Sequence, residues 1–249
     1  MTLMTTPTES SQEPPAPIDH DHPDVTGGWL RPAVFGAMDG LVSNAALIAG
    51  VAGGTRDHTD ASVVVLAGLA GLAAGAFSMA AGEYASVASQ SEAAEREIAK
   101  ERQEIIDNPA GETAELADML VMRGVDPEIA RQASAQMHDN LDDALAVHSL
   151  AELGVNPDEL ASPMTAAVSS FVSFAVGALV PVLPYLFGTV SLIPSLVLTL
   201  LALFGCGAVV TRLTSRPWWF GGLRQVLLGG AAFGLTYVVG MAVGGSGLA

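Results

Sequence analysis

The stretch that decides the fold is FGAMDGLVSNAALIAG, residues 35–50, which carries one charged residue, Asp39, in an otherwise apolar and small-residue run. It lies inside residues 32–54, a segment long enough to cross the hydrocarbon core of a bilayer as one helix. Asp39 would then lie about two turns inside the membrane. A carboxylate at that depth costs a few kcal/mol and is by default a functional residue.

Four further segments are apolar and long enough to span a membrane. The chain has 249 residues, half of them hydrophobic, and a mean hydropathy of +0.44, which argues against a soluble domain. The third of the five segments contains Pro181 and Pro184, which we expect to kink or end it. The sequence therefore predicts an all-α, multi-pass membrane protein with five transmembrane helices, at residues 32–54, 61–88, 164–187, 190–211 and 221–245.

Charge is concentrated between the second and third spans. The chain has 26 acidic and 10 basic residues, and residues 91–159 hold 17 of the acids and 5 of the bases. This acidic excess argues against a nucleic acid partner and favours cations. The lone cysteine, Cys206, lies in an apolar segment and implies no disulfide framework.

Basic residues predict the orientation in the membrane. With a cytoplasmic N-terminus, nine of the ten basic residues fall on the inner side, and only Arg56 lies outside. The acidic segment is then a cytoplasmic insert, whose predicted helices are bounded by Pro109, by Gly124 and by an N-cap at Asp126. We expect a disordered tail at residues 1–27, two spans at 28–89, a helical metal-binding insert at 90–160 and three spans at 161–249.

The first two spans carry three candidate metal ligands. Asp39 and Met79 are each eight residues from the expected inner end of their helix, at Arg31 and Val87, so antiparallel neighbours would hold them at one depth. Glu83 lies one turn closer to the cytoplasm on the face of Met79. We interpret the three as an inward-opening cation path. The alternative is that Asp39 caps a neighbour, Glu83 extends to the interface and Met79 only packs.

The insert carries a second set of candidates, made of acidic pairs at helical spacing. Each pair lies on one helix face, and facing carboxylates repel unless cations lie between them. An imidazole added to oxygen ligands suits first-row divalent metals. A solvated acidic face remains the alternative. The candidates are Glu101 with Glu104, Glu112 with Glu115, and His148 with Glu152.

Three motifs resemble the vacuolar iron transporter family, and the resemblance covers nearly everything after the tail. They are VFGAMDGLVSNAALIAGVAGG, AGAFSMAAGEYASVASQ and SFAVGALVPVLPYL. The resemblance implies a homodimer that moves Fe²⁺, and also Mn²⁺ or Co²⁺, out of the cytosol by proton antiport. It implies a divalent metal as substrate and bound ion, no prosthetic group, and a location in a bacterial inner membrane or a eukaryotic vacuolar membrane.

By position, the resemblance assigns the family's pathway residues to Asp39, Met79 and Glu83. Its cytoplasmic glutamates fall on Glu101, Glu104, Glu112, Glu115 and Glu152. Two departures stand out. Met38 replaces a common asparagine and changes the polar face of the first helix. His148 and Ser149 stand where members can have methionines, which makes the cytoplasmic site harder in ligand character and puts a strict Fe²⁺ preference in doubt.

Two other functions remain open from the sequence. A membrane-bound di-iron carboxylate oxidase or ferritin-like protein would favour Glu-x-x-His pairs on its helices. The chain has none, because Ala135 and Leu145 stand three residues before its two histidines in the insert. A membrane-anchored acidic interaction module without transport is the third interpretation.

Overall fold

The computed structural model describes residues 28–55, 60–211 and 216–246, and within these ranges the chain is helical with no strand. The expected tail at residues 1–27 and the lone outer basic residue, Arg56, lie outside the described residues. The helices in chain order are α1 Leu30–Thr55, α2 Ala61–Asp107, α3 Pro109–Met122, α4 Pro127–Met137, α5 Leu141–His148, the π-helix Ser149–Leu153, the 3₁₀ turn Pro157–Glu159, α6 Pro163–Leu179, α7 Leu183–Leu186, α8 Leu192–Val210 and α9 Trp218–Gly245.

Five of the described helical segments are long and apolar enough to cross a membrane, namely α1, α2, α6 together with the turn before it (Pro157–Leu179), α8 and α9. The predicted number of spans is therefore confirmed. The third span is shorter than predicted, because α6 ends at Leu179, just before Pro181. The chain resumes as the short helix α7 with Pro184 in its first turn, where the missing backbone N–H costs nothing.

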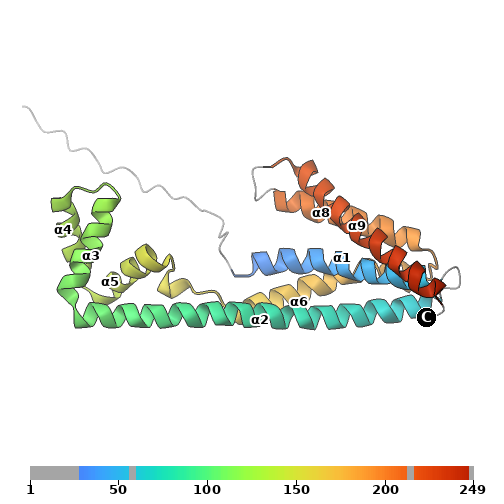
Figure 1. Ribbon diagram of the computed structural model, residues 1–249, viewed down its shortest axis with the longest axis horizontal. Helices are drawn as coiled ribbons and strands as arrows, with labels where there is room; N and C mark the ends of the chain where they lie inside the picture. The colour runs from blue at the N-terminus through green and yellow to red at the C-terminus, as the bar shows by residue number, and fades with distance from the viewer. Residues whose placement is uncertain (1–27, 56–59, 212–215, 247–249) are drawn as a thin grey trace, which may run out of the picture.

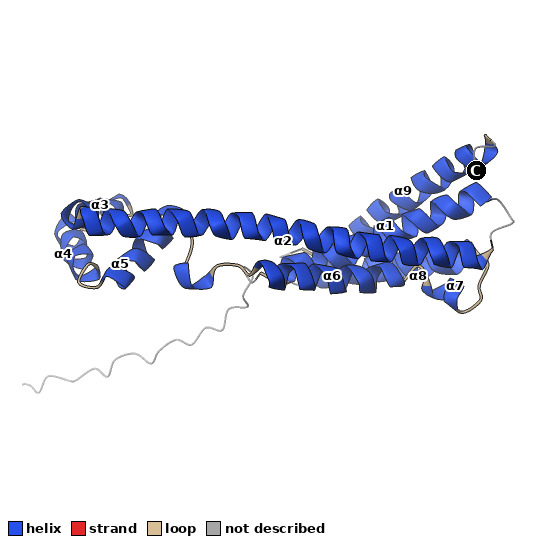
Figure 2. Ribbon diagram, turned by 90° about the horizontal axis from the view of Figure 1, so that it is seen from below, coloured by secondary structure: helices blue, strands red, loops and turns tan. Residues whose placement is uncertain are grey.

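Helix α2 connects the spans to the insert without a break. It has 47 residues and is therefore about 70 Å long, more than twice the thickness of a bilayer core. The sequence analysis expected the second span to end at residue 88 and the insert to begin at residue 90, so a break in the helix was expected between them. The helix does not break there, because no Gly or Pro occurs between Gly82 and the N-cap Asn108 of α3. Helices α3, α4 and α5 pack around the far end of α2 (Figures 1 and 2).

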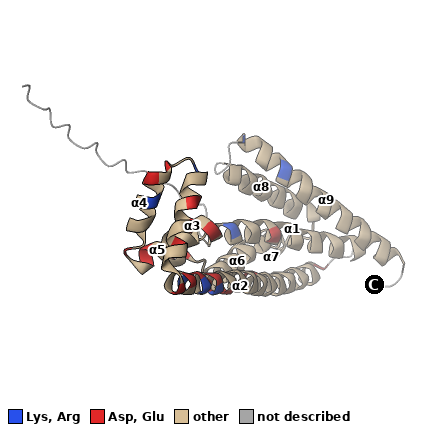
Figure 3. Ribbon diagram, turned by 60° about the vertical axis from the view of Figure 1, so that its left-hand side comes forward, with Lys and Arg blue, Asp and Glu red and all other residues tan. Residues whose placement is uncertain are grey.

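The charged side chains are distributed unevenly between the insert and the spans. Asp and Glu gather on the far half of α2 and on α3–α5, whereas the spans are almost uncharged (Figure 3). Helix α1 begins at the insert side of the spans, since the Ser169 hydroxyl of α6 donates to the Trp29 carbonyl. The Ser91 hydroxyl of α2 similarly donates to the Ala161 carbonyl, just before α6.

Helix α1 is the centre of the span bundle and contacts α2, α6, α8 and α9. Its buried Asn44 joins three helices, because Nδ2 donates to the Gly68 carbonyl of α2 at 3.1 Å and to the Ala178 carbonyl of α6 at 2.6 Å. The backbones approach closely at Gly40, where an added Cβ would collide with the Phe174 carbonyl. Small residues therefore permit contacts that Leu or Ile would prevent.

Glycines also set the packing of α2 and α9. On α2, a Cβ added at Gly75 would collide with the Phe174 ring of α6. On α9, Gly230 and Gly234 have the four-residue spacing common at helix contacts, but no described atom of another element lies within 4 Å of a Cβ built at Gly234. The close approach to α1 occurs instead at Gly240, against the carbonyl of Gly50.

Helix caps fold the insert back on itself. The side chains of Asn108, Asp126 and Asn140 accept backbone N–H groups at the starts of α3, α4 and α5, and the first two helices have Pro in the first turn. Ile105 of α2 packs with Ala144 and Leu145 of α5 in a small core. This core brings the acidic face of α2 against the end of α5.

Candidate metal sites

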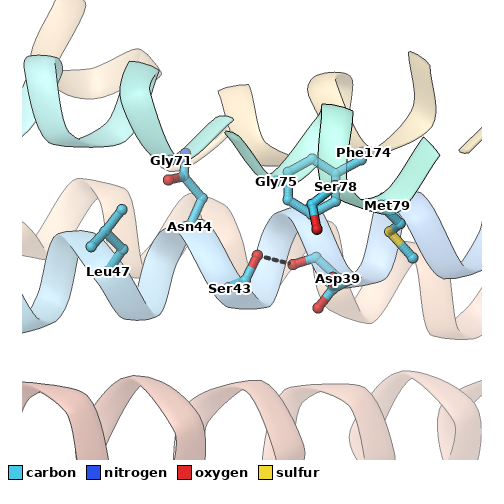
Figure 4. A pocket seen from close by; sticks show the side chains of 9 residues that line it. All are labelled: Asp39, Ser43, Asn44, Leu47, Gly71, Gly75, Ser78, Met79 and Phe174. Carbon is cyan, nitrogen blue, oxygen red and sulfur yellow. Dashed lines mark hydrogen bonds between the residues drawn. The ribbon is translucent and has the colours of Figure 1, made fainter. Parts of the chain in front are cut away.

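A pocket of about 320 Å³ lies between α1 and α2, in the part of the chain that the sequence predicts to be within the membrane. Asp39 from α1 and Met79 from α2 both line it, which brings together two of the three predicted pathway residues (Figure 4). The full lining is Asp39, Ser43, Asn44, Leu47, Gly71, Gly75, Ser78, Met79 and Phe174.

The pocket offers oxygen and sulfur atoms to a cation. The Asp39 carboxylate is the one charged group in the lining, and the Met79 thioether and the Ser78 hydroxyl line the same pocket from α2. The Ser43 hydroxyl donates to the backbone carbonyl of Asp39 at 2.6 Å, which leaves the carboxylate itself available. Asn44 Oδ1 is buried and has no hydrogen-bond partner in the described part of the chain.

Glu83 does not line this pocket. It lies one turn from Met79 toward the insert and is half-buried. Sequence reasoning missed Ser43, Asn44 and Ser78. An amide within an apolar span was the available signal for Asn44, because polar side chains at membrane depth seek partners.

The insert has a second cluster, centred on His148, whose side chain is fully buried. His148 Nδ1 lies 2.9 Å from Glu152 Oε1, 3.0 Å from Glu101 Oε1 and 3.9 Å from Glu112 Oε2. Ligand atoms of Glu101, His148 and Glu152 all lie within 4.8 Å of one another. The structure therefore brings together four of the six residues predicted for the insert.

The spacing of these atoms fits a metal ion. Ligands at right angles around an ion, with bonds of about 2.1 Å, are separated by about 3 Å. The two shortest distances from Nδ1, to Glu152 and to Glu101, match that value. Glu101 Oε1 is buried, and apart from His148 Nδ1 at 3.0 Å no hydrogen-bonding group of the described residues satisfies it, so the site holds an acceptor that a cation would satisfy.

Crowding of carboxylates changes their protonation. Burial, reinforced by the charge of Glu152, raises the pKa of Glu101 above its ordinary value. Burial, reinforced by the charge of Glu115, raises the pKa of Glu112. Glu104 and Glu115 themselves are exposed, and Glu104 pairs with Lys100 at 3.6 Å. These two residues add negative charge beside the cluster, while no described ligand atom of theirs lies within it.

Sequence comparison identifies the family. A model of the VIT family matches residues 30–241, a range that contains both candidate sites. The chain belongs to the VIT family. A vacuolar iron transporter from Acanthamoeba castellanii is 38% identical over 221 residues, covering 85% of this chain and 74% of the relative. Vacuolar iron transporter 1 of Oryza sativa subsp. japonica is 30% identical over 230 residues, covering 90% of each chain.

This VIT-family chain uses the end of α5 to present its imidazole. The helix changes to a π-helix at Ser149–Leu153 and ends at Gly154, whose φ of 69° is left-handed. Wider turns of this kind are frequent at functional sites. His148 and Glu152 stay on one face, as the i, i+4 spacing predicted.

One residue of the insert escaped the sequence analysis of this VIT-family chain. His138, at the end of α4, lies with its Nε2 3.3 Å from the Nε2 of His148. Residues 90–160 contain only two histidines, His138 and His148, and this rarity was the available signal. Its distance of ten residues from His148 gives no helical pairing, so only the fold brings the two rings together.

Proposed function

We propose that this chain transports a divalent transition metal, Fe²⁺ first and also Mn²⁺ or Co²⁺, out of the cytosol, and that it is no enzyme. The observation that carries the proposal is a carboxylate and a thioether from two spans on one pocket, Asp39 and Met79. Mg²⁺ and Ca²⁺ have little use for sulfur, whereas Fe²⁺ and Co²⁺ accept it. The names of the relatives as vacuolar iron transporters support the same metal.

The orientation follows from the basic residues. The described Lys and Arg lie on the insert or near the span ends beside it (Figure 3). Arg31 lies in the first turn of α1, and Arg216 lies just before α9. An excess of Lys and Arg at one side of the spans is typical of the cytoplasmic side. The insert is then cytoplasmic, and metal moves from the insert side toward the opposite ends of the spans.

A homodimer is proposed from the exposure of Asp39. Phe35, Asp39, Ser43 and Leu47 recur every fourth residue of α1, and all four are exposed in the single chain. A carboxylate facing lipid is expensive, so this stripe needs a polar neighbour. A second copy across a two-fold axis would bring two Asp39 carboxylates together, where a divalent cation offsets their repulsion.

The remaining candidate residues suit the entry of the metal ion and the coupling of its transport to protons. Glu83 lies between the pocket and the insert along α2, so it is the group that would receive the ion and exchange a proton. The cluster at His148 concentrates ions on the cytoplasmic side and is not part of the path through the bilayer. Its loss should slow transport without abolishing it.

Flux into liposomes tests the proposal. Purified protein should move Fe²⁺, Mn²⁺ and Co²⁺, faster with an opposing pH gradient, and Asp39→Asn should abolish flux while the protein stays folded and dimeric. Asp39→Asn keeps the shape of the side chain and removes its charge. Flux at the wild-type rate in a folded Asp39→Asn protein would show that the aspartate is structural. Iron-dependent oxygen consumption without flux would favour the oxidase.

A further inference from the structure

Two backbone carbonyls fix the orientation of the Asn44 side-chain amide. Nδ2 lies 3.1 Å from the Gly68 carbonyl oxygen of α2 and 2.6 Å from the Ala178 carbonyl oxygen of α6. Carbonyl oxygens only accept hydrogen bonds, so both must face the N–H groups of the amide. The opposite orientation would set oxygen against oxygen. Oδ1 is therefore held on the side of the amide that faces away from these carbonyls.

The Ala178 carbonyl needs this donor because α6 ends beside a proline. Pro181 has no backbone N–H, and the N–H of Val182 donates to the Leu179 carbonyl instead. A backbone carbonyl without a donor is costly at membrane depth, and the Asn44 amide supplies the donor. Because backbone atoms of two helices hold the amide, its oxygen has a fixed position before any ion arrives.

This oxygen is buried and has no hydrogen-bond partner in the described part of the chain. Asn44 is 2% exposed, and no described group donates to Oδ1. A Cβ added at Gly71 would lie 2.7 Å from Oδ1, so the glycine leaves open a side of the oxygen that a side chain would cover. Asn44 and Gly71 line the same pocket as Asp39 and Met79. An unpaired oxygen in this lining requires a donor or a cation from the pocket.

The pocket extends along the helices, and Asn44 lies toward its end away from the insert (Figure 4). On α1, Asn44 lies five residues beyond Asp39, a rise of about 7.5 Å. On α2, Gly71 lies eight residues from Met79, a rise of about 12 Å. Opposite ligands of one ion are only about 4 Å apart. The pocket therefore has two levels in series along the proposed direction of transport.

We propose that Asn44 Oδ1 is a ligand of a second cation position, which receives the divalent metal after Asp39 and Met79. This second position rests on the transport proposed above, and it adds the group that takes the ion next. A neutral amide oxygen replaces one water of the ion and adds no charge that would retain it. Passage through sites in series requires such binding, because each site must also release the ion.

The test compares two substitutions of similar volume that differ in a ligand atom. Asn44→Leu and Asn44→Met both remove the amide and its hydrogen bonds, but only methionine offers a thioether. In liposomes, both full-length variants should carry Mn²⁺ at least about tenfold more slowly than wild type, because Mn²⁺ prefers oxygen and loss of one partner at a metal site costs about 10- to 100-fold. Co²⁺ accepts sulfur, so Asn44→Met should carry Co²⁺ about tenfold faster than Asn44→Leu.

A substitution at Gly71 tests the oxygen while the amide stays in place. The new Cβ of Gly71→Ala would cover Oδ1 without removing the hydrogen bonds of Nδ2, so the flux of both metals should fall. Gly82→Ala is the matched control on α2, because no described atom lies within 4 Å of its Cβ. We expect wild-type flux in this control.

The possible results separate the second position from transport itself. Absence of metal flux in the wild type would contradict the proposed transport. With wild-type transport present, equal Co²⁺ flux through Asn44→Leu and Asn44→Met would show that Asn44 only joins the helices, and wild-type flux through a folded Gly71→Ala protein would overturn the second position too. Crystals of the wild-type protein soaked in Mn²⁺ decide even where a substitution disturbs folding. Anomalous scattering should show a peak within about 3 Å of Oδ1, and a peak at Asp39 alone would overturn the second position.

Discussion

Replacing Glu101 by glutamine removes one negative charge from the cluster and keeps the shape of the side chain. In the metal-free protein, this charge is buried and close to that of Glu152, with ligand atoms within 4.8 Å of each other. Two unit charges 4.8 Å apart repel by about 0.9 kcal/mol in bulk water and by about 3.5 kcal/mol at an effective dielectric constant of about 20. Glu152 is exposed to solvent, so the lower half of this range applies.

We therefore expect Glu101→Gln to stabilise the metal-free insert by about 1 to 2 kcal/mol. The amide can also donate to the acceptors of the cluster. Bound metal reverses the sign of this stability difference, because the variant has lost a ligand and a negative charge that compensates the charge of the metal. A metal at 100 times its dissociation constant stabilises the wild-type insert by about 2.7 kcal/mol, and a tenfold weaker affinity removes about 1.4 kcal/mol of that.

Hydrogen exchange of peptides from α2 to α5 measures these changes locally. The three tryptophans cannot report them, because none lies in the insert. Metal-free Glu101→Gln protein should exchange about 5- to 30-fold more slowly than wild type, and Mn²⁺ should protect it less. Glu97→Gln is the matched control, since Glu97 is exposed one turn away on the same helix. Faster exchange without metal, together with full protection by Mn²⁺, would show that Glu101 only holds the helices together.

The pH dependence of the metal-free insert follows from the raised pKa values of Glu101 and Glu112. The folded state binds these protons more tightly than the unfolded state, so stability is fully present below about pH 4.5 and is lost as the pH rises through the folded pKa values. Circular dichroism melts of the EDTA-treated protein should show this loss of stability with rising pH. Excess Mn²⁺ should abolish the loss, because metal binds the deprotonated carboxylates. Stability that rises with pH in EDTA would contradict the repulsion between the clustered carboxylates. In the spans, Gly40→Ala should destabilise the protein by about 1 to 3 kcal/mol through collision of the new Cβ with the Phe174 carbonyl. Gly82→Ala, where no described atom lies within 4 Å of the new Cβ, should be neutral or stabilising by up to about 1 kcal/mol. Equal melting temperatures for the two variants would refute the close contact of α1 and α6.

The sequence by itself determined the features that depend on neighbours along the chain. Span length and hydropathy predicted five membrane helices, and Pro181 explained where α6 ends, since proline removes a backbone donor. Asp126 with Pro127 predicted the start of α4 through capping. The pairing of His148 with Glu152 also follows from local geometry, because residues four apart lie on one helix face.

Only the tertiary structure decided which distant groups meet. Glu101 and His148 are brought to 3.0 Å by the packing of α5 on the far half of α2, and no helical spacing encodes that distance. The same packing separates Glu101 from the exposed Glu104, which the sequence had treated as its equal. His138 meets His148 through the turn between α4 and α5. Exposure of Asp39 on the surface of the single chain likewise depends on which faces of α1 its four neighbouring helices cover. Local periodicity assigns residues to a face of a helix, but burial and coordination depend on what that face packs against.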